Sequence, residues 1–358
     1  MNYKIEPNKG PAYLQIYMQI KQDIVDGTYA YGSKLPSKRL LCEETGVSII
    51  TVEHAYDLLI EEGYVESRER SGYFVVFRSS DGFAASSRSY PVFHPHPTTS
   101  ATASFPFSVL ARSMRRVLTD YGEALLEKAP NSGCKELREA LRSYLQRNKD
   151  IVVGSDQIVI GSGAEYLYGL IVELLGRDLV YGIESPSYAK IEQVYCAENV
   201  KYEPLPLTSD GIDSYSLSKT NASVLHVSPY RSYPTGVTAS ASKRHEYVRW
   251  AAKEGRYIIE DDFESEFSLS PKAEDTLFSL SKGKSVIYLN TFSKTISPSL
   301  RIGYMVLPKS LVELFEKKLG FYSCTVPTYE QYLLTDLIVS GAFERHINRV
   351  RRALRKND

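Results

Sequence analysis

Residues 79–104, SSDGFAASSRSYPVFHPHPTTSATAS, divide the chain into two parts. The segment is rich in Ser, Thr and Pro and shows neither a helical nor a strand period. Because it offers no apolar face to a hydrophobic core, we expect it to be a flexible linker. The chain has 358 residues, more than a single hydrophobic core usually organises. We therefore expect two domains, residues 1–78 and residues 105–358.

Composition describes a globular protein whose charge alone does not point to DNA. The chain holds 43 basic and 43 acidic residues, and residues 1–78 carry nine Lys and Arg against eleven Asp and Glu. A DNA-binding role must therefore rest on the placement of residues. No apolar run is long enough to span a bilayer and no secretory signal opens the chain, so we expect a cytoplasmic protein without a membrane partner.

No metal site is expected. The four cysteines are far apart and form no CxxC pair, a pattern that suits neither a zinc site nor a disulfide framework. His94 and His96 lie between prolines without Cys or acidic neighbours, so they are better explained as part of the linker.

The first 78 residues predict a winged helix-turn-helix. Apolar residues share one face of a helix over Ala12–Asp26, Ser37 can cap a short helix that runs to Glu44, and Ser48 can cap a third helix that ends at Gly63. Two short apolar runs then bracket the polar turn ESRERSG, which predicts a two-stranded wing; they are Tyr64–Val65 and Tyr73–Val76.

The run GTYAYGSKLPSKRLLCEETGVSIITVEHAYDLLIEEGYVESRERSGYFV resembles the DNA-binding domain of the GntR family. The resemblance implies double-stranded DNA as partner and places five positions near it: Ser37, Arg39, Ser48, Thr51 and Gly72. Hydroxyls at a helix start can meet phosphates, and an arginine fork can read a base edge.

Two basic residues of the wing, Arg68 and Arg70, are expected to follow the DNA backbone. Ile49 departs from the family, which usually has arginine there, so the base preference stays open. The alternative is that these residues only cap and solvate a small helical domain, which would explain Ser37 and Ser48 but not the basic wing.

After residue 104 the pattern alternates helices with short apolar runs and predicts an α/β domain with a largely parallel sheet. The expected strands are Gln157–Ile160, Leu179–Ile183, Val224–Val227, Tyr257–Ile259, Ser285–Leu289 and Tyr304–Leu307. Ligands of such sheets bind where the strands end, and the polar motifs of this part of the chain fall there.

The segments IIEDDF and LNTFSKTISPSLRIGY resemble fold-type I aminotransferases, and most closely the MocR-type regulators, which are GntR proteins fused to such a domain. The resemblance implies that Lys294 forms a Schiff base with pyridoxal 5'-phosphate and that Arg301 holds the phosphate. Asp261 follows a predicted strand and would pair with the pyridinium nitrogen. Glu260 and Asp262 are adjacent alternatives that the spacing from Lys294 disfavours.

Two further segments complete the expected cofactor site. The run GSGAEYLY opens a helix, so the backbone there can cradle the phosphate; its residues are Ser162, Gly163, Ala164 and Glu165. Tyr188, in ESPSY, matches the position where the family stacks an aromatic ring on the cofactor.

Three places depart from the family pattern. Phe263 replaces a tyrosine that hydrogen-bonds the cofactor, Arg231 and Ser232 replace a His-Gln pair, and Lys128 replaces a tyrosine that reaches across a dimer.

Together these patterns predict a regulator that responds to pyridoxal 5'-phosphate and to an amine or amino acid effector. Its aminotransferase-like domain would serve as sensor and as the unit that forms a homodimer, so we assign no catalytic residue. Family chains continue into a small C-terminal subdomain, whereas this sequence ends at Asp358, and we expect residues 105–358 to lack it. Two rival hypotheses are an aminotransferase that carries a winged helix, and a DNA-binding protein whose second domain is only a scaffold.

Overall fold

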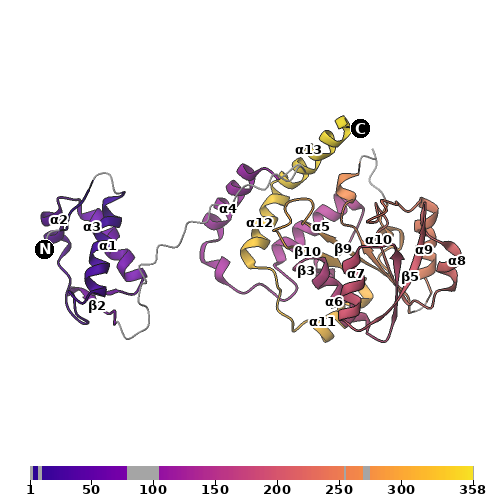
Figure 1. Ribbon diagram of the computed structural model, residues 1–358, viewed down its shortest axis with the longest axis horizontal. Helices are drawn as coiled ribbons and strands as arrows, with labels where there is room; N and C mark the ends of the chain where they lie inside the picture. The colour runs from indigo at the N-terminus through magenta and orange to yellow at the C-terminus, as the bar shows by residue number, and fades with distance from the viewer. Residues whose placement is uncertain (1–2, 7–9, 79–104, 254, 269–274, 358) are drawn as a thin grey trace. The chain divides into compact units, whose positions relative to one another are not determined.

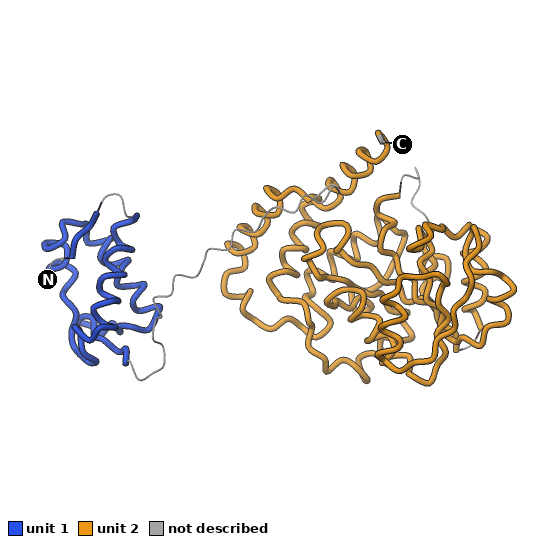
Figure 2. The backbone as a smooth tube through the Cα atoms, viewed as in Figure 1, with its two compact units in different colours: residues 1–97 blue, residues 98–358 orange. Residues whose placement is uncertain are grey.

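The computed structural model describes residues 3–6, 10–78, 105–253, 255–268 and 275–357. The chain forms two compact units, Met1–Pro97 and Thr98–Asp358 (Figure 2). The expected linker, residues 79–104, lies outside the described residues, and so do His94 and His96. In the part of the chain that is described, no helix combines the length and the apolarity needed to cross a membrane.

The first unit is a winged helix-turn-helix, as predicted. It consists of α1 (Ala12–Val25), α2 (Lys38–Thr45), α3 (Ile49–Glu61), β1 (Val65–Arg68) and β2 (Gly72–Val75). The two predicted caps are confirmed, because Ser37 accepts a hydrogen bond from the amide of Leu40 and Ser48 accepts one from the amide of Thr51. The residues predicted to face inward are buried: Ile16, Tyr17, Ile20 and Ile24 on α1, and Val52, Ala55, Tyr56 and Leu59 on α3.

The second unit is built on an eight-stranded sheet with the order β3-β10-β9-β8-β7-β4-β5-β6. The strands are β3 (Ile158–Gly161), β4 (Val180–Ser185), β5 (Lys201–Thr208), β6 (Gly211–Ile212), β7 (Val224–Val227), β8 (Tyr257–Asp261), β9 (Val286–Thr291) and β10 (Gly303–Val306). Five neighbouring strands, from β5 through β4, β7 and β8 to β9, run parallel, which confirms the predicted sheet type. The strand β10 pairs antiparallel with β9 and with β3.

Helices cover both faces of this sheet (Figure 1). They are α4 (Phe107–Tyr121), α5 (Lys135–Lys149), α6 (Ala164–Leu175), α7 (Ala189–Ala197), α8 (Ser214–Lys219), α9 (Ala241–Ala251), α10 (Leu277–Leu280), α11 (Lys309–Leu319), α12 (Thr328–Val339) and α13 (Ala342–Asn357), with short 3-10 turns at Gly122–Leu126, Ser155–Gln157 and Ser265–Phe267. One apolar core joins the sheet to α5, α9, α10, α12 and α13. A second core joins the opposite face to α6, α7 and α11.

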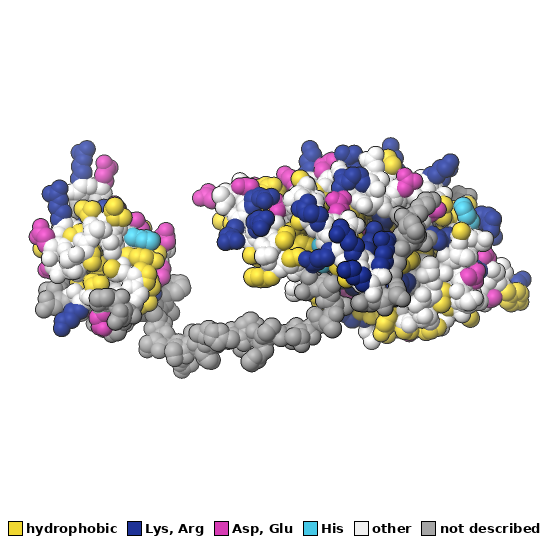
Figure 3. Space-filling view, turned by 90° about the horizontal axis from the view of Figure 1, so that it is seen from above, with side chains coloured by type: hydrophobic (Ala, Val, Ile, Leu, Met, Phe, Trp, Pro, Cys, Tyr) yellow, Lys and Arg dark blue, Asp and Glu magenta, His cyan; other side chains and the backbone are white. Residues whose placement is uncertain are grey.

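The C-terminal helix α13 presents a basic outer face. Basic side chains gather on the face of the second unit that Figure 3 shows, and the sequence of α13 contributes Arg345, Arg349, Arg352, Arg355 and Lys356, all exposed. Arg351 behaves differently, since its Nε donates a hydrogen bond to the backbone oxygen of Glu266 at 2.6 Å. The tail is therefore mostly a solvated helix face with one arginine anchored to the domain.

Candidate functional site

The start of α3 and the adjacent α2 place four of the predicted DNA-contacting residues on the surface of the first unit. Ser37, Arg39 and Ser48 are exposed, and Thr51 is half-buried. The hydroxyls of Ser48 and Thr51 lie 2.8 Å apart. Ile49, where the family has arginine, is 47% exposed, so an apolar side chain stands on the surface that would face bases.

The wing brings basic side chains together around one aromatic ring. Arg68 lies over the ring of Phe74 and also pairs with Glu66 at 2.6 Å, so this guanidinium is already engaged. Lys34 contributes a cation that the sequence interpretation missed. It pairs with Phe74 across an isolated β-bridge, and its side chain would lie 2.9 Å from a Cβ added at Gly72.

In the second unit, a cavity of about 240 Å³ opens at the carboxyl ends of the parallel strands. Six of the eight residues expected to bind the cofactor line it: Ala164, Glu165, Tyr188, Asp261, Lys294 and Arg301. The other two, Ser162 and Gly163, directly precede the adjoining helix α6. Segments that are far apart in the sequence thus meet where an α/β sheet binds ligands.

Lys294 follows β9 and points its ammonium toward an acidic neighbour. Its Nζ lies 3.3 Å from Oε1 of Glu264 and 4.7 Å from the ring centre of Phe263. Phe263 and Glu264 come close to Lys294 because they lie just after the end of β8, which pairs with β9.

Asp261 ends β8 and faces the cavity. Its Oδ2 accepts a short hydrogen bond from the phenol of Tyr168 on α6, while its Oδ1 is buried and has no partner among the described residues. His226 on β7 lies close by, with Nε2 3.8 Å from Asp261 Oδ2 and Nδ1 2.7 Å from the hydroxyl of Tyr195. A buried carboxylate oxygen without a partner fits a ligand that brings a protonated ring nitrogen.

Glu260 and Asp262 point to the opposite face of the sheet, because side chains alternate along a strand. Glu260 accepts hydrogen bonds from the amides of Leu277 and Phe278 at 2.7 and 2.9 Å, and burial raises its pKa to about 8. Neither acid is free to meet a ligand in the cavity, which leaves Asp261 as the acid at this strand end.

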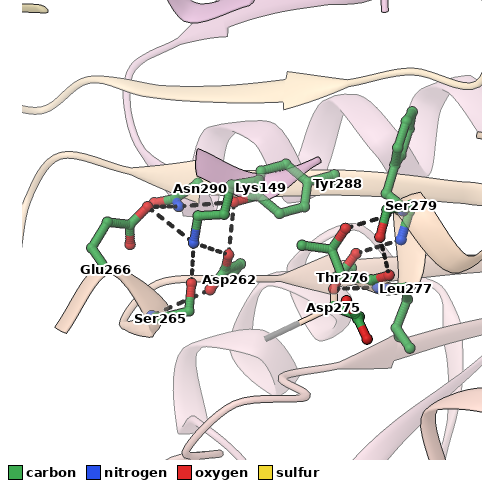
Figure 4. Close-up of polar contacts among 12 residues, drawn as sticks. Lys149, Asp262, Ser265, Glu266, Asp275, Thr276, Leu277, Ser279, Tyr288 and Asn290 are labelled. Atoms are coloured by element: carbon green, nitrogen blue, oxygen red, sulfur yellow. Dashed lines mark hydrogen bonds and ion pairs between the residues drawn. The ribbon is translucent and has the colours of Figure 1, made fainter. Parts of the chain in front are cut away.

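A buried ionic cluster holds the segment that follows β8 (Figure 4). Lys149 pairs with Asp262 at 2.8 Å and with Glu266 at 3.4 Å, and it also bonds the hydroxyl of Ser265. Burial by itself would lower the pKa of Lys149, but the charges of Asp262 and Glu266 raise it to about 12. The cluster fixes both ends of the segment that presents Phe263 and Glu264 to Lys294.

The expected phosphate cradle lies at the start of α6, where the first amides of a helix lack intrahelical acceptors. Two of its amides are already engaged, since Ser162 donates to the hydroxyl of Thr325 and Gly163 donates to the oxygen of Gly161. The backbone at Gly163 has a φ of +97°, and a Cβ there would lie 2.8 Å from Nη2 of Arg301. Only glycine lets the guanidinium approach the loop this closely.

Glu184 and Ser232 form a buried polar pair in the cavity wall. Ser232 donates to Oε2 of Glu184 at 2.6 Å, and the amide of Ser228 donates to the same oxygen at 3.2 Å. Burial raises the pKa of Glu184 to about 7, helped by the charge of Asp261. The cavity thus contains a carboxyl group that exchanges its proton near neutral pH.

Aromatic rings line the mouth of the cavity. Tyr188, the expected stacking residue, is 39% exposed and meets Tyr233 edge to face at 5.9 Å. Arg231, which replaces a family histidine, lies with its Nε 4.0 Å from Glu264.

Comparison with known families assigns both units. The family described as bacterial regulatory proteins, gntR family, matches residues 12–75, and aminotransferase class I and II matches residues 101–357. The chain is 27% identical over 96% of its length to the probable rhizopine catabolism regulatory protein MocR of Rhizobium meliloti, of which 74% is covered. The chain belongs to the MocR-type transcription regulators.

Other MocR-type relatives agree. The chain is 32% identical to the uncharacterized HTH-type transcriptional regulator YdeL of Bacillus subtilis, over 97% of this chain and 77% of that protein. It is 26% identical to the HTH-type pyridoxine biosynthesis transcriptional regulator PdxR of Corynebacterium glutamicum, over 98% of this chain and 77% of that protein. These relatives are named as transcriptional regulators, and each match extends over nearly the whole of this chain.

Solved structures place the second unit of this MocR-type chain among the aminotransferases, a family that binds pyridoxal 5'-phosphate. A kynurenine aminotransferase of Pyrococcus horikoshii matches with a TM-score of 0.63 and 25% identity over 69% of this chain. The chain spans 64% of the length of that enzyme, somewhat under two thirds.

The sequence interpretation of this MocR-type chain missed the cavity residues Tyr168, Glu184 and Tyr233. It also missed His226, which lies beside Asp261. A weak signal existed for His226, a polar residue inside the apolar run of β7 that is only 1% exposed. A polar side chain within a buried strand must find a partner, and here Tyr195 supplies it.

Proposed function

We propose that this chain is a cytoplasmic, homodimeric transcription regulator that responds to pyridoxal 5'-phosphate. Residues 1–78 would bind double-stranded DNA, and residues 105–358 would bind the cofactor, sense an amine or amino acid effector and form the dimer. When bound, the cofactor supplies an electrophilic carbon that an amine can attack. Residues of the cavity at the strand ends would hold it.

One observation carries the cofactor proposal. Lys294, Asp261 and Arg301 line the same cavity, and the Oδ1 atom of Asp261 is buried there without a partner among the described residues. The carboxylate would hold the ring nitrogen in its protonated form. Lys294 would hold the aldehyde carbon, and Arg301 with the first amides of α6 would hold the phosphate.

The buried hydroxyl of Ser187 supports the fit independently. Ser187 belongs to the lining of the same cavity, and its buried Oγ has no partner in the described part of the chain. The aromatic rings of Tyr188 and Phe263 supply flat apolar surfaces for a pyridine ring. Phe263 cannot donate a hydrogen bond to the cofactor, whereas Tyr233 places a phenol in the cavity lining that could donate one.

Borohydride trapping tests the proposal directly. The full chain incubated with pyridoxal 5'-phosphate and then reduced should carry the cofactor on the peptide that contains Lys294, as located by mass spectrometry. Lys294→Ala should lose this label, whereas Lys309→Ala, which removes an exposed lysine at the start of α11, should keep it. A label that persists on Lys294→Ala would show that another group holds the cofactor.

The rival aminotransferase hypothesis makes a different prediction in the same preparation. A transaminase converts the bound cofactor to its amine form when amino acids are added, and a second substrate restores it. A regulator that only senses would bind the amino acid without such turnover. Following the cofactor spectrum through repeated additions of amino acids and keto acids therefore separates the two functions.

A further inference from the structure

Glu165 places a carboxylate among the groups expected to bind phosphate. It is the second residue of α6, and its Oε2 accepts a hydrogen bond from Nη2 of Arg301 at 2.6 Å. Its Oε1 accepts one from Nζ of Lys190 at 2.6 Å. A guanidinium from the segment after β9 and an ammonium from α7 thus converge on one acidic side chain.

These donors are the set that a phosphate requires. A guanidinium fork, an ammonium and the amides at a helix start are the usual phosphate ligands in proteins. Although burial alone would raise the pKa of Glu165, hydrogen bonds from Lys190, its own amide and Arg301 lower it to about 2. The carboxylate is therefore charged at every pH at which the protein would bind DNA.

The two cations that meet Glu165 are already partly neutralised by its carboxylate. Arg301 is held against the loop at Gly163, since a Cβ there would lie 2.8 Å from its Nη2. With Glu165 in place, two cations face one anion, which leaves a single positive charge. A phosphate ester carries about −1.5 to −2 near neutral pH and would need both cations to itself.

We propose that Glu165 is an internal competitor of the ligand phosphate, so that a phosphorylated ligand binds by displacing its carboxylate from Arg301 and Lys190. This inference rests on the proposed function, because it concerns the same cavity. Displacement makes the ligand affinity lower than the cation pair alone would give. A regulator gains from this, since a lower affinity lets the bound fraction follow the ligand concentration.

A simpler role for Glu165 would be to stabilise the start of α6, where an acidic side chain interacts favourably with the helix dipole. That role requires neither Lys190 nor Arg301. The two roles differ in what they predict for phosphate, because an acid that only stabilises the helix would not compete with a ligand.

The test compares Glu165→Gln with Glu173→Gln in the full chain. Glu173 lies on the same helix and pairs with Arg177, so it offers the same substitution in a Glu–Arg pair that does not line the cavity. Glu165→Gln should lower the Kd for pyridoxal 5'-phosphate at least about tenfold, because the phosphate no longer has to displace a charged carboxylate from Arg301 and Lys190. Glu173→Gln should leave it unchanged.

Pyridoxal, which lacks the phosphate, shows whether the effect acts at the phosphate. Its Kd should be the same for the original chain and for Glu165→Gln. Equal gains for both ligands, or no gain for pyridoxal 5'-phosphate, would overturn the proposal. Circular dichroism and thermal unfolding of both variants confirm that they fold.

Binding of inorganic phosphate tests the role of Glu165 independently of whether the chain binds pyridoxal 5'-phosphate. If no variant binds pyridoxal 5'-phosphate, the cofactor proposal fails, and calorimetric titration with inorganic phosphate then decides the role of Glu165. Tighter phosphate binding by Glu165→Gln than by Glu173→Gln supports an internal competitor. Equal phosphate affinities overturn it.

Discussion

Tyr168 donates its phenol hydrogen to Oδ2 of Asp261, a residue of the cavity lining, and leaves Oδ1 of the same carboxylate buried without a partner in the described chain. Oδ1 is therefore the oxygen that remains available to a ligand. Since Tyr168 belongs to α6, whose first residues are those proposed to hold the phosphate, one helix would position groups at both ends of the proposed cofactor.

Tyr168→Phe should weaken binding of pyridoxal 5'-phosphate by about fivefold to tenfold, because losing one hydrogen bond costs about 1 kcal/mol. Asp261→Asn should weaken it more, since the amide cannot stabilise a protonated ring nitrogen. Tyr181→Phe is the matched control, as Tyr181 is a buried tyrosine of the same core that bonds the oxygen of Gly176. Equal cofactor affinity for Tyr168→Phe and the original chain would remove Tyr168 from the site.

Glu184 should make the ligand-free second unit less stable as pH rises. Its pKa is raised from 4.5 to about 7 in the folded chain by burial, so the folded state holds a proton that the unfolded state releases between these values. The free energy of unfolding should fall across that window by about 3 kcal/mol and should not recover above pH 7.

Glu184→Gln removes the part of the pH dependence that Glu184 contributes, whereas the part due to the raised pKa of Glu260 remains. Between pH 5 and pH 8, denaturant unfolding should show a smaller loss of stability for the variant than for the original chain. Trp250 is the sole tryptophan of the sequence and is buried on α9, so its fluorescence follows the second unit alone. Parallel pH profiles for the two proteins would show that Glu184 does not titrate in this range.

Lys149→Met should destabilise the second unit by about 3–5 kcal/mol, because it leaves Asp262 and Glu266 buried without their cation. Trp250 fluorescence in urea measures the loss, and Lys309→Met serves as the control for an exposed lysine. A loss below about 1 kcal/mol would mean that the buried acids find other partners or take up protons.

Arg39→Ala should cost about 1–3 kcal/mol of DNA-binding free energy if the guanidinium reads a base edge. The probe is a duplex selected by the full chain from a random-sequence library, at a fixed salt concentration. Lys4→Ala, which removes an exposed cation beside Gln19 of α1, is the charge-matched control. If both variants lose the same small amount, Arg39 contributes only to the general attraction for phosphates.

Local features were predictable because neighbours along the chain determine them. The caps at Ser37 and Ser48 follow from a hydroxyl placed before an apolar helical period, and the approach of Lys294 to Asp261 follows from the way parallel strands end at one edge. The strand β5 was missed. Its Pro204 and Pro206 argue against a strand. The sheet tolerates these prolines because β5 lies near the border of the sheet, where only the short β6 follows it.

Contacts between side chains from distant segments were not predictable. Glu165 was expected to offer its backbone to a phosphate, but its side chain reaches Arg301, 136 residues away. Likewise, the pairing of Lys294 with Glu264 depends on how β8 and β9 are packed rather than on any motif. Tertiary packing determines these side-chain orientations, and it leaves no periodic pattern in the sequence from which they could be predicted.

The coupling of the two units is tested most directly by measuring the Kd of the full chain for its selected duplex with and without saturating pyridoxal 5'-phosphate. Lys294→Ala serves as the comparison, because it retains the DNA-binding residues and loses the lysine that would hold the cofactor. We predict a change of at least about fivefold for the original chain and none for Lys294→Ala. An unchanged Kd in a chain that demonstrably carries the cofactor would contradict this prediction.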